Sequence, residues 1–176
     1  MSVRRYVLTG APGAGKTTLI DALRARGHTV VAEAATDVIA RGWGAGRPPW
    51  LLDTFLDDVV ALQVERERAA TGEVIFFDRS PLCTLALARY AQLAVPAALR
   101  DAVGRASGFY QRRAFLVRPL GFVRRTAARR ISYADSLRFA AIHEEVYAAH
   151  GFTLIALPKA PVADRIAALL REVATG

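Results

Sequence analysis

The most constraining feature of the sequence is a nine-residue stretch that matches G-x-x-x-x-G-K-T, the pattern of a phosphate-binding loop. We call it the phosphate loop, and it consists of Gly10, Ala11, Pro12, Gly13, Ala14, Gly15, Lys16, Thr17 and Thr18. Strand-forming apolar residues precede it at 6–9, and residues 19–26 after it have apolar positions at helical spacing. A glycine-rich turn that merely starts a helix is the alternative. The strand before and the helix after favour phosphate binding instead.

Each residue type in the phosphate loop has a physical role in binding a nucleoside triphosphate. Glycines adopt backbone angles that other residues avoid, and they let amide N–H groups face a phosphate, next to the positive end of the following helix. Lys16 can reach the outer phosphates, and the Thr17 hydroxyl can bind Mg²⁺. The chain contains only two lysines, and one of them is Lys16. These features predict ATP or GTP together with Mg²⁺ as the ligands.

Strand-like and helical patterns alternate along the chain. Strands are predicted at 6–9, 28–33, 74–77, 114–117 and 152–157, and helices at 19–26, 34–41, 51–70, 82–93, 96–106, 133–150 and 162–173. This alternation predicts a three-layer α/β/α fold, with a five-stranded parallel sheet covered on both faces. We see no repeat or linker, so we expect residues 1–176 to form a single P-loop domain. Ligands of such sheets bind where the strands end.

Two neighbouring charged residues follow the most apolar predicted strand, at 74–77. Asp78 stands in the Walker B arrangement, where a carboxylate can hold the water shell of Mg²⁺ or accept a proton from an attacking hydroxyl. Arg79 can neutralise an anionic substrate. The alternative is an Asp that caps a helix beside a surface Arg. The phosphate loop favours the functional interpretation.

A second carboxylate is expected at the same edge of the sheet. Glu33 ends the strand predicted at 28–33, and a carboxylate there is costly unless it is solvated or used. We interpret Glu33 as a general base or as a group that binds a substrate hydroxyl, and Asp37, one helical turn on, as a weaker candidate. A Glu at the start of an exposed helix remains the alternative.

Residues 118–132 are rich in arginine and form a candidate lid. The arginines are Arg118, Arg124, Arg125, Arg129 and Arg130. Phosphoryl transfer needs positive charge around the migrating group, and a lid that closes over the nucleotide can bring it. A solvated basic loop or a nucleic-acid patch would have the same composition.

A loop rich in Gly and Pro lies between the helices predicted at 34–41 and 51–70. Trp43, Arg47 and Trp50 in this loop could line a pocket for a flat acceptor, or the tryptophans could simply attach the loop to the core.

Composition limits the function classes. The formal net charge of +8 favours an anionic partner, and nucleotide phosphates meet that expectation without nucleic acid. The single cysteine, Cys83, excludes an internal disulfide and predicts a core side chain in a reducing, cytoplasmic setting. The chain has no Asn, hence no N-K-x-D motif of a Ras-like GTPase. No run is long enough to span a membrane, there is no signal-peptide pattern, and the three His lack the spacing of metal ligands.

Several of these segments together resemble a known family. The phosphate loop, Glu33-Ala34-Ala35, Phe77-Asp78-Arg79, the arginine-rich segment before a long helix, and Leu157-Pro158 with Val162 and Arg165 are similar to the small bacterial P-loop proteins described as predicted ATPases of the AAA type. These are related to nicotinamide riboside kinase-like and other nucleoside or nucleotide kinase-like P-loop domains.

The resemblance implies further expectations. The sheet order would be 2-3-1-4-5. Arg129 would be a lid arginine, Arg125 would contact the nucleotide, and Lys159 and Ala160 would belong to a base-contacting loop. The chain departs from the family at Thr36, at Ser80-Pro81 and at Arg118-Pro119-Leu120, positions that would face the acceptor.

The sequence therefore favours a Mg²⁺-dependent phosphotransferase that uses ATP or GTP and acts on a hydroxyl or phosphate of an unidentified small molecule. In this hypothesis Lys16, Asp78, Glu33 and Arg129 are catalytic. A nucleotide-dependent binding module with slow hydrolysis is the second hypothesis. A polynucleotide kinase or nucleic-acid binder is the third hypothesis, suggested by the net charge of +8. It ranks last because the arginines gather in the candidate lid and no aromatic-interleaved RNA motif is present.

Overall fold

The strands of the protein form one parallel sheet. The computed structural model describes residues 3–10, 13–42, 48–118 and 133–175. The strands are β1 (Arg4–Thr9), β2 (Thr29–Val31), β3 (Val74–Asp78), β4 (Arg113–Leu116) and β5 (Thr153–Ala156). All their pairings are parallel, and the order β2-β3-β1-β4-β5 confirms the expectation.

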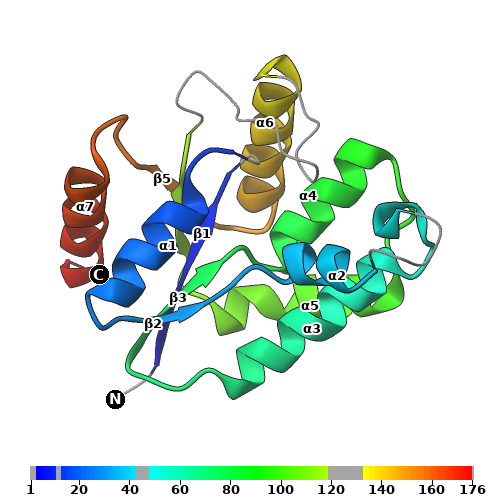
Figure 1. The fold of residues 1–176 in the computed structure, drawn as a ribbon, viewed down its shortest axis with the longest axis horizontal. Coiled ribbons are helices and arrows are strands. Elements are labelled where there is room, and N and C mark those ends of the chain that lie inside the picture. Colours follow the sequence, from blue (N-terminus) through cyan, green and yellow to red (C-terminus); the bar gives the residue numbers. More distant parts are fainter. Residues whose placement is uncertain (1–2, 11–12, 43–47, 119–132, 176) are drawn as a thin grey trace.

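Helices cover both faces of this sheet (Figure 1). They are α1 (Lys16–Ala25), α2 (Ala34–Gly42), α3 (Phe55–Ala69), α4 (Pro81–Ala91), α5 (Ala97–Phe109), α6 (Tyr133–Ala149) and α7 (Val162–Ala174), with a 3-10 turn η1 at Pro49–Leu51. Helices α1 and α7 lie side by side on one face, and the remaining helices lie on the other. Among the described helices, none has the length and apolar character needed to cross a membrane.

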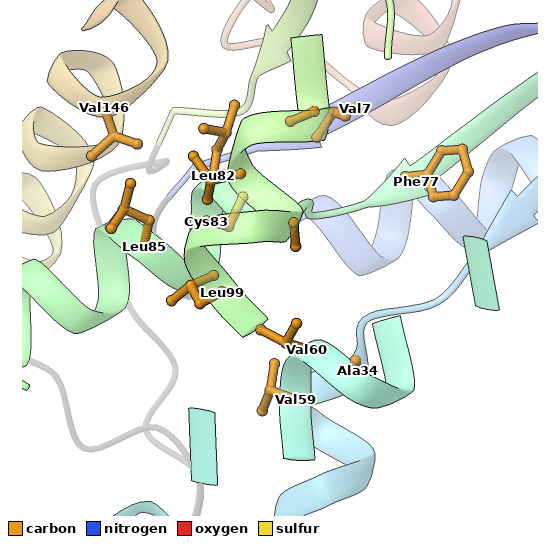
Figure 2. Close-up of a cluster of buried hydrophobic side chains, with 14 of the residues drawn as sticks. Val7, Ala34, Val59, Val60, Phe77, Leu82, Cys83, Leu85, Leu99 and Val146 are labelled. Carbon is orange, nitrogen blue, oxygen red and sulfur yellow. The ribbon is translucent and has the colours of Figure 1, made fainter. Parts of the chain in front are cut away.

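Alternation along the central strands divides the core into two clusters. Successive side chains of a strand point to opposite faces. Val7 and Phe77 therefore join the cluster beneath helices α2 to α6, and Figure 2 shows this cluster with side chains of α3, α4 and α5. Leu8 and Phe76 join the cluster under α1 and α7. Because β1 and β3 are buried on both faces, the phosphate loop and Asp78 start from rigid strands.

Two boundaries differ from the sequence prediction. The helix predicted over 51–70 begins at Phe55, because the chain first makes the η1 turn and leaves Leu51 54% exposed. At the new start, Thr54 Oγ1 donates a hydrogen bond to Asp58 Oδ2 at 3.1 Å. Strand β2 has three residues instead of the predicted 28–33, since an edge strand pairs only with β3.

Candidate functional site

The phosphate loop leaves β1 through a residue that must be glycine. Gly10 has φ 130°, and a Cβ atom there would lie 2.3 Å from the carbonyl oxygen of Val117. Val117, which follows β4, donates its amide to Thr9 O at 2.9 Å, so the two backbones are fixed close together. Residues 11 and 12 lie outside the described residues. Gly15 has φ 93° and directly precedes α1. The loop thus has the backbone form that directs amides toward an anion.

The Lys16 side chain is buried beside the phosphate loop. Its Nζ donates to Gly10 O at 2.9 Å, and the residue is 5% exposed. Burial and the charge of Arg79 lower the pKa of Lys16 to about 8, against the opposing influence of Asp78 and Glu33. An anion on the loop would restore the ordinary pKa, because it favours the ammonium form. The hydroxyl-bearing Thr17 follows in the first turn of α1 and is exposed.

Asp78 ends β3 next to Lys16. Burial raises the pKa of the Asp78 carboxyl, while Lys16 lowers it, as does a hydrogen bond from Thr17. Its Oδ1 is buried and makes no hydrogen bond to the described residues. The described residues contain no cluster of three His, Cys, Asp or Glu for a metal. Mg²⁺ however keeps several waters and binds through one or two carboxylates plus substrate phosphates. Oδ1 of Asp78 and the Thr17 hydroxyl fit such an ion.

Arg79 has an unusual backbone. Its φ of 78° lies in the left-handed region, which residues other than Gly and Asn rarely adopt. Backbone strain of this kind often occurs at functional sites. Two hydrogen bonds maintain it: the Arg79 amide donates to Leu8 O at 3.0 Å, and Gln63 Nε2 on α3 donates to Arg79 O at 3.3 Å. This backbone turns the guanidinium toward the loop, where Nη1 donates to Gly10 O at 3.4 Å.

Glu33 forms an ion pair with Arg79, and both side chains are mostly buried. Thr36 Oγ1 donates to Glu33 Oε2 at 3.0 Å. Burial is the largest influence and acts to raise the pKa of Glu33, but Arg79, Lys16 and the Thr36 hydrogen bond together hold it below the usual value. Glu33 is therefore ionised at neutral pH. Thr36 is thus a direct partner of this carboxylate.

Arg66 on α3 is a residue that the sequence interpretation missed. Its Nη1 donates to Ala32 O at 3.0 Å and to Glu33 O at 2.8 Å, and its Nη2 pairs with Asp37. Arg66 therefore holds the end of β2 and the start of α2, and Asp37, a predicted substrate ligand, is engaged in that contact. Nothing in the local pattern marked Arg66, because it lies in a run of alternating charges, Glu65 to Arg68.

A buried polar network lies beneath the site. Tyr147 Oη on α6 is 2.7 Å from Ser80 Oγ and 3.3 Å from Cys83 Sγ, and Thr9 Oγ1 is 3.3 Å from the same sulfur. Burial acts to raise the pKa of Cys83, but His143 and Arg79 lower it to about 6. Cys83 is buried, as predicted, and the network ties β1 and α4 to α6.

The other predicted residues are spread more widely. Lys159 and Ala160 follow β5, with Lys159 exposed, and Trp50 is half-buried in η1. Arg118 at the start of the candidate lid is exposed and lies 4.0 Å from Glu144. Six further predicted residues lie outside the described residues: Trp43, Arg47, Arg124, Arg125, Arg129 and Arg130.

Comparisons with known proteins agree with the fold. A family model described as an AAA domain matches residues 5–165. A solved structure of deoxyadenosine kinase from M. mycoides, with products dCMP and dCDP bound, is similar at 12% identity and a TM-score of 0.61, over 97% of this chain and 98% of that one. NadR in complex with NR is similar at 14% identity and a TM-score of 0.72, over 88% of this chain.

The chain spans only 45% of the length of NadR. No curated protein sequence matches the chain significantly. At these identities the two structures show a shared architecture, the α/β P-loop kinase fold. The family match over residues 5–165 shows that the chain belongs to the AAA domain family.

Proposed function

We propose that this protein is a Mg²⁺-dependent phosphotransferase, which moves the terminal phosphate of ATP or GTP to a hydroxyl or phosphate group of a small molecule. One observation supports this more than any other. The ends of β1, β2 and β3 bring two cations and two carboxylates together: both cations donate to Gly10 O, and one of them forms an ion pair with a carboxylate. The four residues are Lys16, Asp78, Arg79 and Glu33.

The two carboxylates differ in environment, which suggests different roles. Glu33 is held ionised by Arg79, which supports a role as the group that accepts a proton from the acceptor hydroxyl. Asp78 is more deeply buried and accepts a hydrogen bond from Thr17, and its Oδ1 has no hydrogen-bond partner among the described residues. We assign Asp78 and Thr17 to Mg²⁺, which when bound would neutralise charge on the β- and γ-phosphates.

In the proposed reaction, the acceptor oxygen forms a bond to the terminal phosphorus as the bond from phosphorus to the leaving diphosphate breaks. Lys16 stabilises negative charge on the outer phosphates. The hydroxyl proton passes to the Glu33 carboxylate. Arg79 then loses part of its attraction to Glu33, and it can bind an anionic group of substrate or product instead. From the lid segment, we propose Arg129 and Arg125 as further phosphate ligands.

The neighbours suggest a class of acceptor. Deoxyadenosine kinase and the NR complex of NadR both involve nucleoside-like ligands. The first candidate acceptors to test are therefore deoxynucleosides, NR and their monophosphates. Thr36 and Ser80 differ from what relatives have, so this chain is expected to choose within that class by its own contacts.

The test measures nucleotide binding and product formation separately. We expect wild type to release ADP and form a phosphorylated acceptor, detected by mass spectrometry. Lys16→Ala should abolish nucleotide binding. Glu33→Gln should bind nucleotide within about threefold of wild type yet lose at least about a hundredfold in kcat, because proton transfer is removed without a change in shape.

Three outcomes contradict parts of the proposal. Full turnover by Glu33→Gln would reject Glu33 as the base. Full ATP turnover by Lys16→Ala would reject the site. Steady hydrolysis that no acceptor changes, with a tight ADP complex, would favour the nucleotide-dependent binding module.

A further inference from the structure

Arg165 on α7 is a mostly buried arginine. The residue is 3% exposed, and its buried Nε has no hydrogen-bond partner among the described residues. Two other partly buried arginines are ion-paired, Arg113 with Glu172 and Arg66 with Asp37, and Arg5 lies over the ring of Phe109. A buried charge without a partner is costly. Burial accordingly lowers the pKa of Arg165. An anionic ligand from outside the chain would stabilise a charge in this position.

The guanidinium of Arg165 lies against the phosphate loop. A Cβ atom on Gly15 would be 3.4 Å from Arg165 Nη1, so the group lies close to the residue immediately before Lys16. The contact arises because α7 packs along α1 on the same face of the sheet (Figure 1). Arg165 stands in the first turns of α7, where its amide donates to Pro161 O at 3.1 Å.

The position of this charge separates it from the cations already described. Lys16 and Arg79 both donate to the carbonyl of Gly10, at the start of the loop and on the side of β3. Arg165 lies near the opposite end, at Gly15, and comes from α7, on the face of the sheet that α1 covers. A phosphate chain on the loop would then have cations at both ends, and each would gain an anionic partner on binding.

We propose that Arg165 is a further nucleotide-binding residue, whose guanidinium donates to phosphate oxygens of a nucleotide held on the phosphate loop. This inference rests on the nucleotide-binding half of the proposed function, and it does not depend on the acceptor. The proposal also predicts that this charge destabilises the ligand-free fold, and that binding of the anion offsets the destabilisation.

The experiment compares Arg165→Met with Arg171→Met, an exposed arginine on the same helix. Met keeps the length and apolar stem of the side chain but removes the charge. The probes are Mg²⁺-ADP and inorganic pyrophosphate, measured by titration calorimetry, together with the Tm of the ligand-free protein. We expect R165M to weaken the binding of both probes at least about tenfold. Its ligand-free Tm should equal or exceed that of wild type, and R171M should bind as wild type does.

A purely structural role predicts a different result. ADP affinity within twofold of wild type would overturn the inference, whatever the Tm. Weakened ADP binding with unchanged pyrophosphate binding would also overturn it, because the contact would then be to base or sugar. Arg165→Lys decides the matter if R165M does not fold: loss of the forked donor should weaken both probes at least about threefold, and wild-type affinity would refute the proposal.

The result is distinguishable from failure of the proposed function. Absence of a phosphorylated acceptor, with ADP and pyrophosphate still bound by wild type, would count against phosphotransfer and leave the role of Arg165 testable. Normal phosphotransfer by an R165M protein with wild-type affinity would count only against Arg165.

Discussion

Nucleotide binding should take up a proton at alkaline pH, because the Lys16 amine is partly neutral in the free protein. The pKa of Lys16 is lowered to about 8 by burial and by Arg79, and its usual value is 10.5. A bound phosphate chain favours the ammonium form and raises the pKa again. The proton that completes the ammonium group must then come from solvent.

The size of the effect follows from the free-protein pKa. With a value of about 8, the fraction of neutral Lys16 is about 0.1 at pH 7, about 0.5 at pH 8 and about 0.9 at pH 9. Binding should therefore take up about those numbers of protons per ADP. Above pH 8 the affinity should fall toward tenfold per pH unit. The terminal phosphate of ADP, with a pKa of about 6, is already ionised in this range.

Calorimetry in pairs of buffers with different ionisation enthalpies measures this uptake directly. Lys159→Gln is a matched control, since Lys159 is the other lysine of the chain and is exposed. That variant should keep the full uptake. In Lys16→Arg the guanidinium stays charged throughout, so whatever binding remains should take up no proton. Uptake near zero at pH 9 in wild type, or uptake lost in Lys159→Gln, would refute the reasoning.

Stability of the free protein provides an independent check with a defined sign. The folded pKa of Lys16 lies below the unfolded value, so the unfolded chain binds this proton more tightly. The resulting destabilisation, about 3 kcal/mol, is present below pH 8 and is relieved as pH rises from about 8 to about 10.5. Urea unfolding over that interval should show the rise, and Lys16→Met should remove it.

Three further predictions follow from other parts of the structure. Gly10→Ala should destabilise the fold by about 3 kcal/mol, because its Cβ would lie 2.3 Å from Val117 O; an unchanged urea midpoint would contradict this. Arg66→Gln should raise the KM for the acceptor and lower Tm while the ADP Kd stays constant, since it holds the end of β2; a change in ADP Kd alone would argue against that role. Burial raises the pKa of Glu67 despite a hydrogen bond from Tyr110, so stability should decline as pH rises above about 4.5. Glu67→Gln should remove that decline, and a pH-independent difference between the two proteins would count against it.

Much of the fold was predictable from the sequence because it depends on local periodicity. The apolar run before Asp78 and the alternation of strands with helices predicted a parallel sheet, which the structure confirms. The strand order came from the resemblance to a family, since periodicity does not specify which strands pair. Helix α3 began later than predicted, because the apolar pattern does not register the turn at η1.

The sequence by itself determined the phosphate loop, because its glycines, lysine and threonine act through backbone form and fixed spacing within one short segment. Only the tertiary structure decided the partners of the charged side chains. Arg66 pairs with Asp37, 29 residues away, and Arg165, near the far end of the chain, lies close to Gly15. Side chains so far apart in the sequence come together only when strands and helices pack, and no local sequence pattern predicts such a contact. The phosphate loop is therefore a property of the sequence, whereas the arrangement of charge around it is a property of the fold.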